Sequence, residues 1–189
     1  MAREWRFARA VRGLVFGLRA CISMLACTGV FAQGSSVEYA VKATYLYKFA
    51  PFVEWPAGTF DSPNDPFMLC VVGHDPVAVL VDQAVQGQQV AGHVIDVLHL
   101  AQVRRDARCH ILYVATHGPA AAVALDSVRG LPVLTVTDAA PDPRARGIVN
   151  FIVQDNRVRF EIDPRAASEN HLVISSKLLN LAVEPSPKP

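Results

Sequence analysis

Three side chains that could ligate a metal ion recur at intervals of three residues in the middle of the chain. His93, Asp96 and His99 would share one face of a helix, where imidazole nitrogens and a carboxylate oxygen can bind zinc. The surrounding Val, Ile and Leu residues instead predict a strand, on which Asp96 points away from both histidines. We therefore expect no metal site, and no cofactor elsewhere in the chain.

Two short motifs resemble fragments of catalytic sites. Cys109-His110 puts a thiol next to an imidazole, but adjacent residues on a strand face opposite sides and cannot form a nucleophile and base dyad. Ser175-Ser176-Lys177 lacks the Ser-x-x-Lys spacing that brings lysine and serine together on a helix turn. We expect a core cysteine beside a half-buried histidine in the first case and a helix cap in the second.

A third motif lies where α/β proteins often bind anions. Gly73-His74-Asp75-Pro76 follows an apolar run and precedes a helical pattern, and helix N-termini attract negative charge. Asp75 would repel an anion, so we expect it to cap the helix, with Pro76 as the first helical residue.

The elements that carry these residues alternate between strand and helix. We predict strands at 67–73, 90–98, 109–115 and 131–137, and helices at 37–52, 77–84 and 119–129, after a polar leader at 33–36. The first helix should end near residue 50, because Pro51 cannot donate a helical hydrogen bond. Strands that alternate with helices indicate an α/β fold with a mostly parallel sheet.

The pattern changes after residue 146. The stretches 147–153 and 158–162 flank a turn at 154–157, which predicts an antiparallel hairpin at the sheet edge. A helix from 164 to about 169, a helix over 177–183 and a disordered tail from about 184 follow. The expected architecture is a three-layer sandwich in which helices flank this sheet.

Two features could serve protein binding. Arg157, Arg159 and Glu161 alternate with apolar residues and would share one face of the hairpin, which is usually the solvent side of a sheet. Beside exposed aromatic residues of the first helix, that face could equally be a docking surface. Trp55 is either a core residue or an interface anchor.

The first 32 residues read as an export signal. They hold five arginines and one acid, then an apolar run from residue 13 that ends in Val30-Phe31-Ala32, so we predict cleavage after Ala32 and a periplasmic location. Arg19 interrupts the run, which argues against a permanent membrane anchor. Cys27 leaves a lipid-acceptor site as an alternative to an ordinary signal.

Composition places the remaining residues, 33–189, in one globular domain. The whole chain has 189 residues, is 51% hydrophobic and 19% charged, and carries a formal charge of +1, which excludes disorder and a polyanion-binding tail. Cys70 and Cys109 are the cysteines left after export. They either form a disulfide, as an oxidising compartment favours, or stay as two buried thiols.

Several segments, taken in order, resemble the YfiR-like family. They are 43–56, which closes on Phe52-Val53-Glu54-Trp55-Pro56, together with 69–73, 109–113, 133–136, 157–162 and 175–179. The resemblance spans 37–183. It implies a periplasmic α/β regulator without catalytic activity, often dimeric, that holds an inner-membrane diguanylate cyclase inactive through contact with its periplasmic part.

The resemblance also implies partners and site residues. An OmpA-like outer-membrane lipoprotein can sequester such a regulator, which releases the cyclase and raises cyclic di-GMP in the cytoplasm; no nucleic acid partner is expected. Cys70 and Cys109 resemble one of the family's disulfide pairs. The interface residues expected here are Trp55, Arg157, Arg159, Glu161 and Lys177.

Two positions depart from the family pattern. The second cysteine pair of some members has no counterpart, because 147–153 contains no cysteine. Pro51 replaces a polar residue in the first helix.

Two rival hypotheses remain from the sequence. A periplasmic small-ligand sensor would bind a metabolite near Gly73–Asp75 or on the face of Arg159 and Glu161. An enzyme would require that His74, His110 or His117 converge in a pocket with Asp138.

Overall fold

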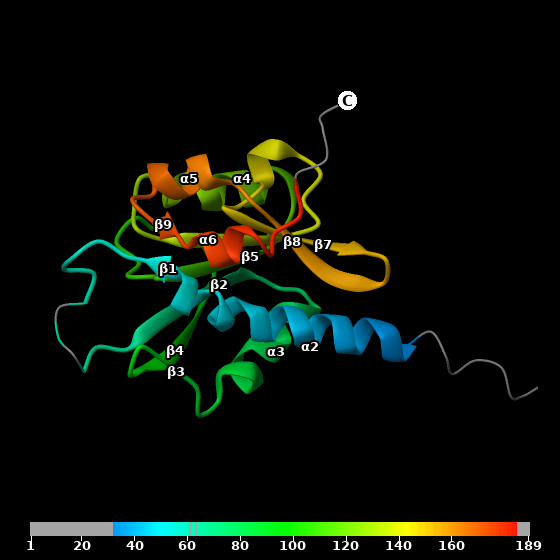
Figure 1. The fold of residues 1–189 in the computed structure, drawn as a ribbon, viewed down its shortest axis with the longest axis horizontal. Helices are drawn as coiled ribbons and strands as arrows, with labels where there is room; N and C mark the ends of the chain where they lie inside the picture. The colour runs from blue at the N-terminus through cyan, green and yellow to red at the C-terminus, as the bar shows by residue number, and fades with distance from the viewer. Residues whose placement is uncertain (1–31, 61, 63, 185–189) are drawn as a thin grey trace, which may run out of the picture. The chain divides into compact units, whose positions relative to one another are not determined.

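A computed structural model describes residues 32–60, 62 and 64–184 (Figure 1). By its internal contacts the chain divides into two units, Met1–Val37 and Glu38–Pro189, and every contact, pocket and surface discussed below belongs to the second. The predicted export signal, the lipid-acceptor alternative at Cys27 and most of the predicted tail lie outside the described residues. The single-domain boundary at residue 33 stays a prediction.

The centre of the second unit is a seven-stranded, mostly parallel sheet. In spatial order its strands are β3 (Gln89–Val90), β4 (His93–Leu100), β2 (Phe67–Gly73), β5 (Ile111–Ala115), β6 (Leu134–Asp138), β7 (Val149–Gln154) and β8 (Arg157–Ile162). Strands β4, β2, β5, β6 and β7 run parallel, whereas β3 and β8 pair antiparallel with their neighbours. The predicted α/β class and the antiparallel hairpin at the edge are confirmed.

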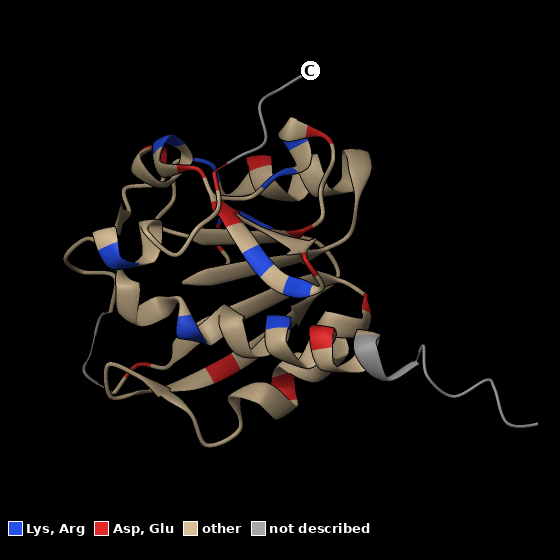
Figure 2. Cartoon of the chain, turned by 45° about the vertical axis from the view of Figure 1, so that its right-hand side comes forward, with Lys and Arg blue, Asp and Glu red and all other residues tan. Residues whose placement is uncertain are grey.

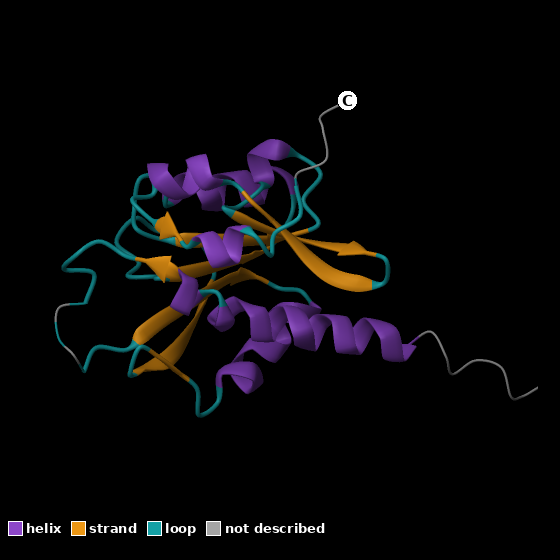
Figure 3. Cartoon of the chain, in the orientation of Figure 1, coloured by secondary structure: helices purple, strands orange, loops and turns teal. Residues whose placement is uncertain are grey.

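Helices cover both faces of this sheet (Figure 3). They are α2 (Ala32–Lys48), α3 (Pro76–Val85), α4 (Gly118–Ser127), α5 (Pro164–Glu169) and α6 (Ser176–Leu179), with short 3-10 turns η2 (Ala50–Phe52) and η3 (Pro143–Ala145). Asp75 caps α3 as predicted, because its carboxylate accepts from the amide of Ala78 at 2.7 Å. Asp163 caps α5 and Ser175 caps α6 in the same way.

The first helix differs from its prediction at both ends. Residues 33–36 were expected to form a polar leader, but they are helical, since none of them prevents helix formation and one glycine costs only about 1 kcal/mol. Regular helix ends at Lys48, and Pro51 lies inside the 3-10 turn that follows. The last predicted helix is also shorter, with four residues instead of seven.

The prediction of one strand over 90–98 was wrong. The chain turns at Ala91 and Gly92, which have φ of 51° and 89°, and this turn separates β3 from β4. Alanine rarely adopts a positive φ, so no typical turn pair marks this hairpin in the sequence. The two-residue strands β1 (Val53–Glu54) and β9 (Val173–Ile174), which pair antiparallel, were also missed.

Each face of the sheet carries its own core. Under α2 and α3, Phe49 packs against Phe151 and Phe160 with ring centroids 5.8 and 5.1 Å apart. On the α4 side, Cys70 and Cys109 form a disulfide between β2 and the residues that precede β5. The structure therefore selects the bridge over two free thiols, and the two cores complete the predicted three layers.

Candidate functional site

Strand β8 of the β7–β8 hairpin carries both basic and acidic residues (Figure 2), and this charged face is only partly exposed. Arg157 and Arg159 are exposed, but Glu161 is 6% exposed, because β8 runs from an exposed turn into the core. The expectation of an exposed charged stripe over all three residues was therefore wrong, because the exposed part of the stripe ends at Arg159. Val153 and Val158, which pair across the hairpin, lie on the opposite face.

A buried polar network fixes the base of this hairpin. The Arg146 guanidinium donates to Glu161 Oε2 at 3.0 Å and to the Ala140 carbonyl at 2.8 Å. Asn150 donates its side-chain amide to Glu161 at 3.2 Å and accepts from the Thr137 hydroxyl at 2.9 Å. Satisfied buried networks of this kind hold a structure in one arrangement. Sequence reasoning missed Arg146, because nothing in a loop arginine's spacing identifies its partner.

The aromatic residues of α2 do not lie beside the arginine face. Tyr45 and Phe49 pack on Phe160, with ring centroids 6.1 and 5.1 Å away. Phe160 alternates with Arg159 along β8, so the aromatic cluster and the arginines occupy opposite faces of the hairpin. The expected surface that combines both is therefore not formed.

Trp55 and Lys177 lie in different surroundings. Trp55 is partly buried, donates its indole N–H to the Pro132 carbonyl at 3.0 Å and packs edge-to-face on Phe67. Pro132 precedes β6, whereas Arg157 follows the parallel strand β7, so Trp55 and the arginines lie toward opposite ends of the sheet. Lys177 is exposed on α6.

A second polar cluster ties α2 to the sheet. Lys42 is 2% exposed, and its ammonium donates to both carboxylate oxygens of Asp138 at 2.8 Å and to Glu38 at 2.5 Å. Burial alone would lower the pKa of Lys42, but the hydrogen bonds to Asp138 and Glu38 outweigh it and raise that pKa. Lys42 is therefore a permanent cation at the carboxyl end of β6.

The residues proposed for an enzyme do not assemble around Asp138. His74 and His117 are exposed and follow β2 and β5, whereas His110 precedes β5 at the other end of that strand. In the described part of the chain, Asp138 hydrogen-bonds to Lys42 and to no histidine. Both carboxylate oxygens of Asp75 are also engaged, one by the α3 amide and the other by the Tyr113 hydroxyl at 2.6 Å.

The metal-ligand candidates are also separated. His93 Nδ1 donates to the Asp65 carbonyl at 2.6 Å, and His99 pairs with Asp82 at 2.8 Å. Within residues 32–60, 62 and 64–184, no three His, Cys, Asp or Glu side chains gather closely enough to bind a metal ion.

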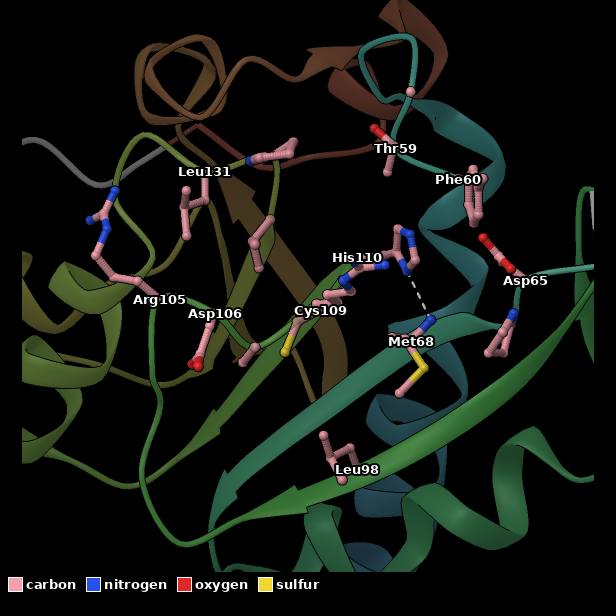
Figure 4. Close-up of a pocket in the computed structure, with 16 residues that line it drawn as sticks. Thr59, Phe60, Asp65, Met68, Leu98, Arg105, Asp106, Cys109, His110 and Leu131 are labelled. Carbon is pink, nitrogen blue, oxygen red and sulfur yellow. Dashed lines mark hydrogen bonds between the residues drawn. The ribbon is translucent and has the colours of Figure 1, made fainter. Parts of the chain in front are cut away.

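The clearest cavity is a groove of about 810 Å³ at the amino ends of β2, β5 and β6 (Figure 4). Its apolar walls include Met68, Leu98, Leu131 and Val133, and its polar groups include Arg105 and Asp106. This size is typical of small-molecule sites. The groove was missed from the sequence, because loops far apart along the chain build it.

One end of the groove is closed by stacked rings. Phe60 stacks between His93 and His110, with centroids 4.2 and 4.5 Å away, and His110 stacks on Phe67 at 4.8 Å. The Met68 amide donates to His110 Nδ1 at 2.8 Å (Figure 4). Burial lowers the pKa of His110, so the ring is neutral at pH 7.

The disulfide lies beside this groove, since Cys109 is one of the lining residues. Its partner Cys70 is fully buried.

Among the residues that the structure describes, no helix has the length and apolar character that a membrane span requires.

Comparison with known proteins gives one assignment. A family profile described as YfiR/HmsC-like matches residues 39–183, which is most of the chain and nearly all of the sheet-containing unit. No curated protein matches the chain. The family predicted from the aromatic helix, the paired cysteines and the late charged strand is confirmed, and the chain belongs to the YfiR/HmsC-like family.

Proposed function

We propose that this protein is a periplasmic, non-enzymatic regulator that represses an inner-membrane diguanylate cyclase by direct contact with its periplasmic part. Family membership supports a periplasmic regulator of a diguanylate cyclase in general. The observation that carries repression by contact is the β7–β8 hairpin, which presents Arg157 and Arg159 to solvent and is held at its base by the pair of part-buried Arg146 and buried Glu161.

The hairpin has the chemistry of a docking edge. Arginine binds carboxylates through a planar, two-pronged set of donors, so two exposed arginines on one strand face favour an acidic partner surface. Ile152 and Gln154, which pair with Arg159 and Arg157 across the hairpin, add a partly apolar floor. Glu161 is buried and hydrogen-bonds to Arg146, so its part in the partner site is to hold the hairpin in place.

The remaining expected residues have smaller parts in the proposal. Lys177 is an exposed base on α6, and after this helix the Val183 amide donates to the Phe160 carbonyl of β8 at 2.9 Å. Trp55 braces the amino ends of β2 and β6. The proposal also includes release of the cyclase when an OmpA-like outer-membrane lipoprotein binds the regulator. It further includes a homodimer of the regulator.

The test is a charge reversal in the intact cell. Deletion of the protein should raise cyclic di-GMP and surface attachment, and restoring the wild-type chain should lower both. Replacing Arg157 and Arg159 by Glu should abolish this complementation and the capture of the cyclase from membranes. The matched control is Arg165→Glu, an exposed arginine on α5. Unchanged cyclic di-GMP in the deletion strain, with the cyclase present, would count decisively against the proposal.

A second candidate function is a small-ligand sensor, and the 810 Å³ groove favours it. This location replaces the two predicted from the sequence, Gly73–Asp75 and the face of Arg159 and Glu161, because Asp75 and Glu161 are both occupied by internal hydrogen bonds. A ligand at one hundred times its dissociation constant should stabilise the protein by about 2.7 kcal/mol. A thermal-shift screen of the wild-type protein would identify that ligand. The same screen with Leu98→Glu, which puts a carboxylate into the groove wall, would show whether the ligand binds in the groove.

A further inference from the structure

The outer edge of β4 is largely unpaired. Strand β3 pairs only with His93 and Val94, so residues 95–100 have β2 on one side and no strand on the other. No other described segment makes a backbone hydrogen bond to this stretch. Unpaired strand edges are templates for another strand, and proteins usually block them with lysine, proline or a bulge. In residues 95–100 the polar side chains are Asp96 and His99.

A hollow of about 460 Å³ follows this edge. It is lined by four consecutive β4 residues, 94–97, and by the end of α3 with the turn that follows it, including Asp82, Gln83 and Gln86. Consecutive strand residues point to opposite faces, so the hollow follows the backbone edge itself and not one face of the sheet. The free length of six residues equals that of a typical strand.

The chemistry along the edge and its hollow specifies what fits there. Val94, which lines the hollow, is 58% exposed, and Leu98, which lies beyond the hollow on the same face of β4 and lines the 810 Å³ groove, is 40% exposed. The charged groups at the rim are the carboxylates of Asp82 and Asp96, and the Asp82 carboxylate is hydrogen-bonded to exposed His99. An extended segment with apolar side chains at alternate positions and a basic side chain among them complements this surface.

We propose that the outer edge of β4 docks an extended, basic segment of the cyclase's periplasmic part as an additional strand. The inference rests on the proposed function for the identity of the partner. It adds a second docking edge, because β4 and the arginine-bearing hairpin lie on opposite sides of the seven-stranded sheet.

Hydrogen exchange measured by mass spectrometry tests the added strand directly. The mature wild-type chain is compared with and without the purified periplasmic part of the cyclase. Amides at alternate positions in 95–100 should exchange at least roughly ten-fold more slowly in the complex, because a new strand satisfies those that now face solvent.

Charge reversal tests the basic character of the segment. Replacing Asp82 and Asp96 together by Lys should weaken binding of the periplasmic part by about ten-fold or more, since like charges then meet. Both residues are exposed, and the matched control is Asp126→Lys on the exposed side of α4. Equal affinity of the double variant and the control would overturn the proposal.

The other outcomes separate this inference from the proposed function. Slowed exchange confined to the hairpin of Arg157 and Arg159 overturns docking at β4 and leaves the proposed function standing. Slowed exchange at 95–100 in the chain alone, increasing with its concentration, assigns the edge to a second copy and also overturns the inference. If the wild-type chain forms no complex with the periplasmic part of the cyclase, both this inference and the proposed function are overturned.

Discussion

Both edges of the sheet are built from hairpins, but the two hairpins are secured differently. At one edge, β7 and β8 pair over six residues each, pack aromatic rings on α2 and close over the Arg146–Glu161 pair. At the other edge, β3 has two residues and leaves most of β4 unpaired. The braced edge presents fixed side chains, whereas the open edge presents backbone. In the complex proposed above, the braced edge would recognise a partner surface by charge and the open edge a partner segment by strand addition.

The largest effect is expected from removing an aromatic ring at the braced edge. Phe151→Ala deletes a fully buried side chain that packs on Phe49 and Tyr45, which should lower the free energy of unfolding by about 3–5 kcal/mol. Val153→Ala, two residues along the same strand but exposed, is the control and should change it by less than about 0.5 kcal/mol. Urea unfolding measures both. Equal effects would mean that α2 does not secure this edge.

A smaller loss is expected from the polar network under the same hairpin. Glu161→Ala leaves Arg146 and the Asn150 amide without their acceptor, at a cost of about 1–3 kcal/mol. Glu161→Gln keeps one acceptor oxygen and should recover part of this loss. If urea unfolding shows both variants to be as stable as wild type, the hairpin is held by its aromatic face alone.

The base of the open edge should respond to pH. His93, which begins β4, stacks through Phe60 on His110, and burial lowers the pKa of His110. A lowered pKa means that His110 binds a proton more readily in the unfolded chain than in the folded one. The free energy of unfolding therefore has its full value above about pH 6.5 and declines as the pH falls below that value. His110→Gln keeps an acceptor for the Met68 amide and should flatten this decline.

The control for the pH experiment is His117→Gln, an exposed histidine outside the stack. Urea unfolding from pH 7.5 to 5 should give the same slope for this variant as for wild type. A His110→Gln protein that retains the full slope would place the titrating group elsewhere.

The smallest effect on stability is expected at the open edge itself. Val94→Thr changes an exposed side chain at the last β4 residue that β3 pairs, directly before the unpaired stretch, so the free energy of unfolding should shift by less than about 0.5 kcal/mol. A larger loss, measured by urea unfolding, would show that the Val94 side chain packs against a partner and that the edge is less open than described.

Sequence patterns predicted the parts of this molecule that depend on local signals. The apolar run of β2, the Asp75 cap with Pro76, and the turn of the β7–β8 hairpin all lie where propensity and spacing put them. The β3–β4 turn escaped detection, because Ala91 adopts a positive φ, which alanine rarely does, so the residue type gives no turn signal.

The site residues could be predicted only where the residue type or its alternation along a strand indicates the role. The Cys70–Cys109 bridge was one of two open alternatives, and the exposed arginines followed from strand alternation. Alternation could not show that Glu161 is buried, because burial depends on Arg146 and on how far β8 runs into the core. The groove could not be found at all, since its rings come from three separate segments.

The disulfide has a topological consequence for the open edge. Cys70 and Cys109 are 39 residues apart, and α3, β3 and β4 all lie inside the covalent ring that they close. A protease that cuts the chain once at the β3–β4 turn therefore releases no fragment. The nicked protein keeps both halves of its least protected hairpin attached to the central strands, and only reduction can separate them.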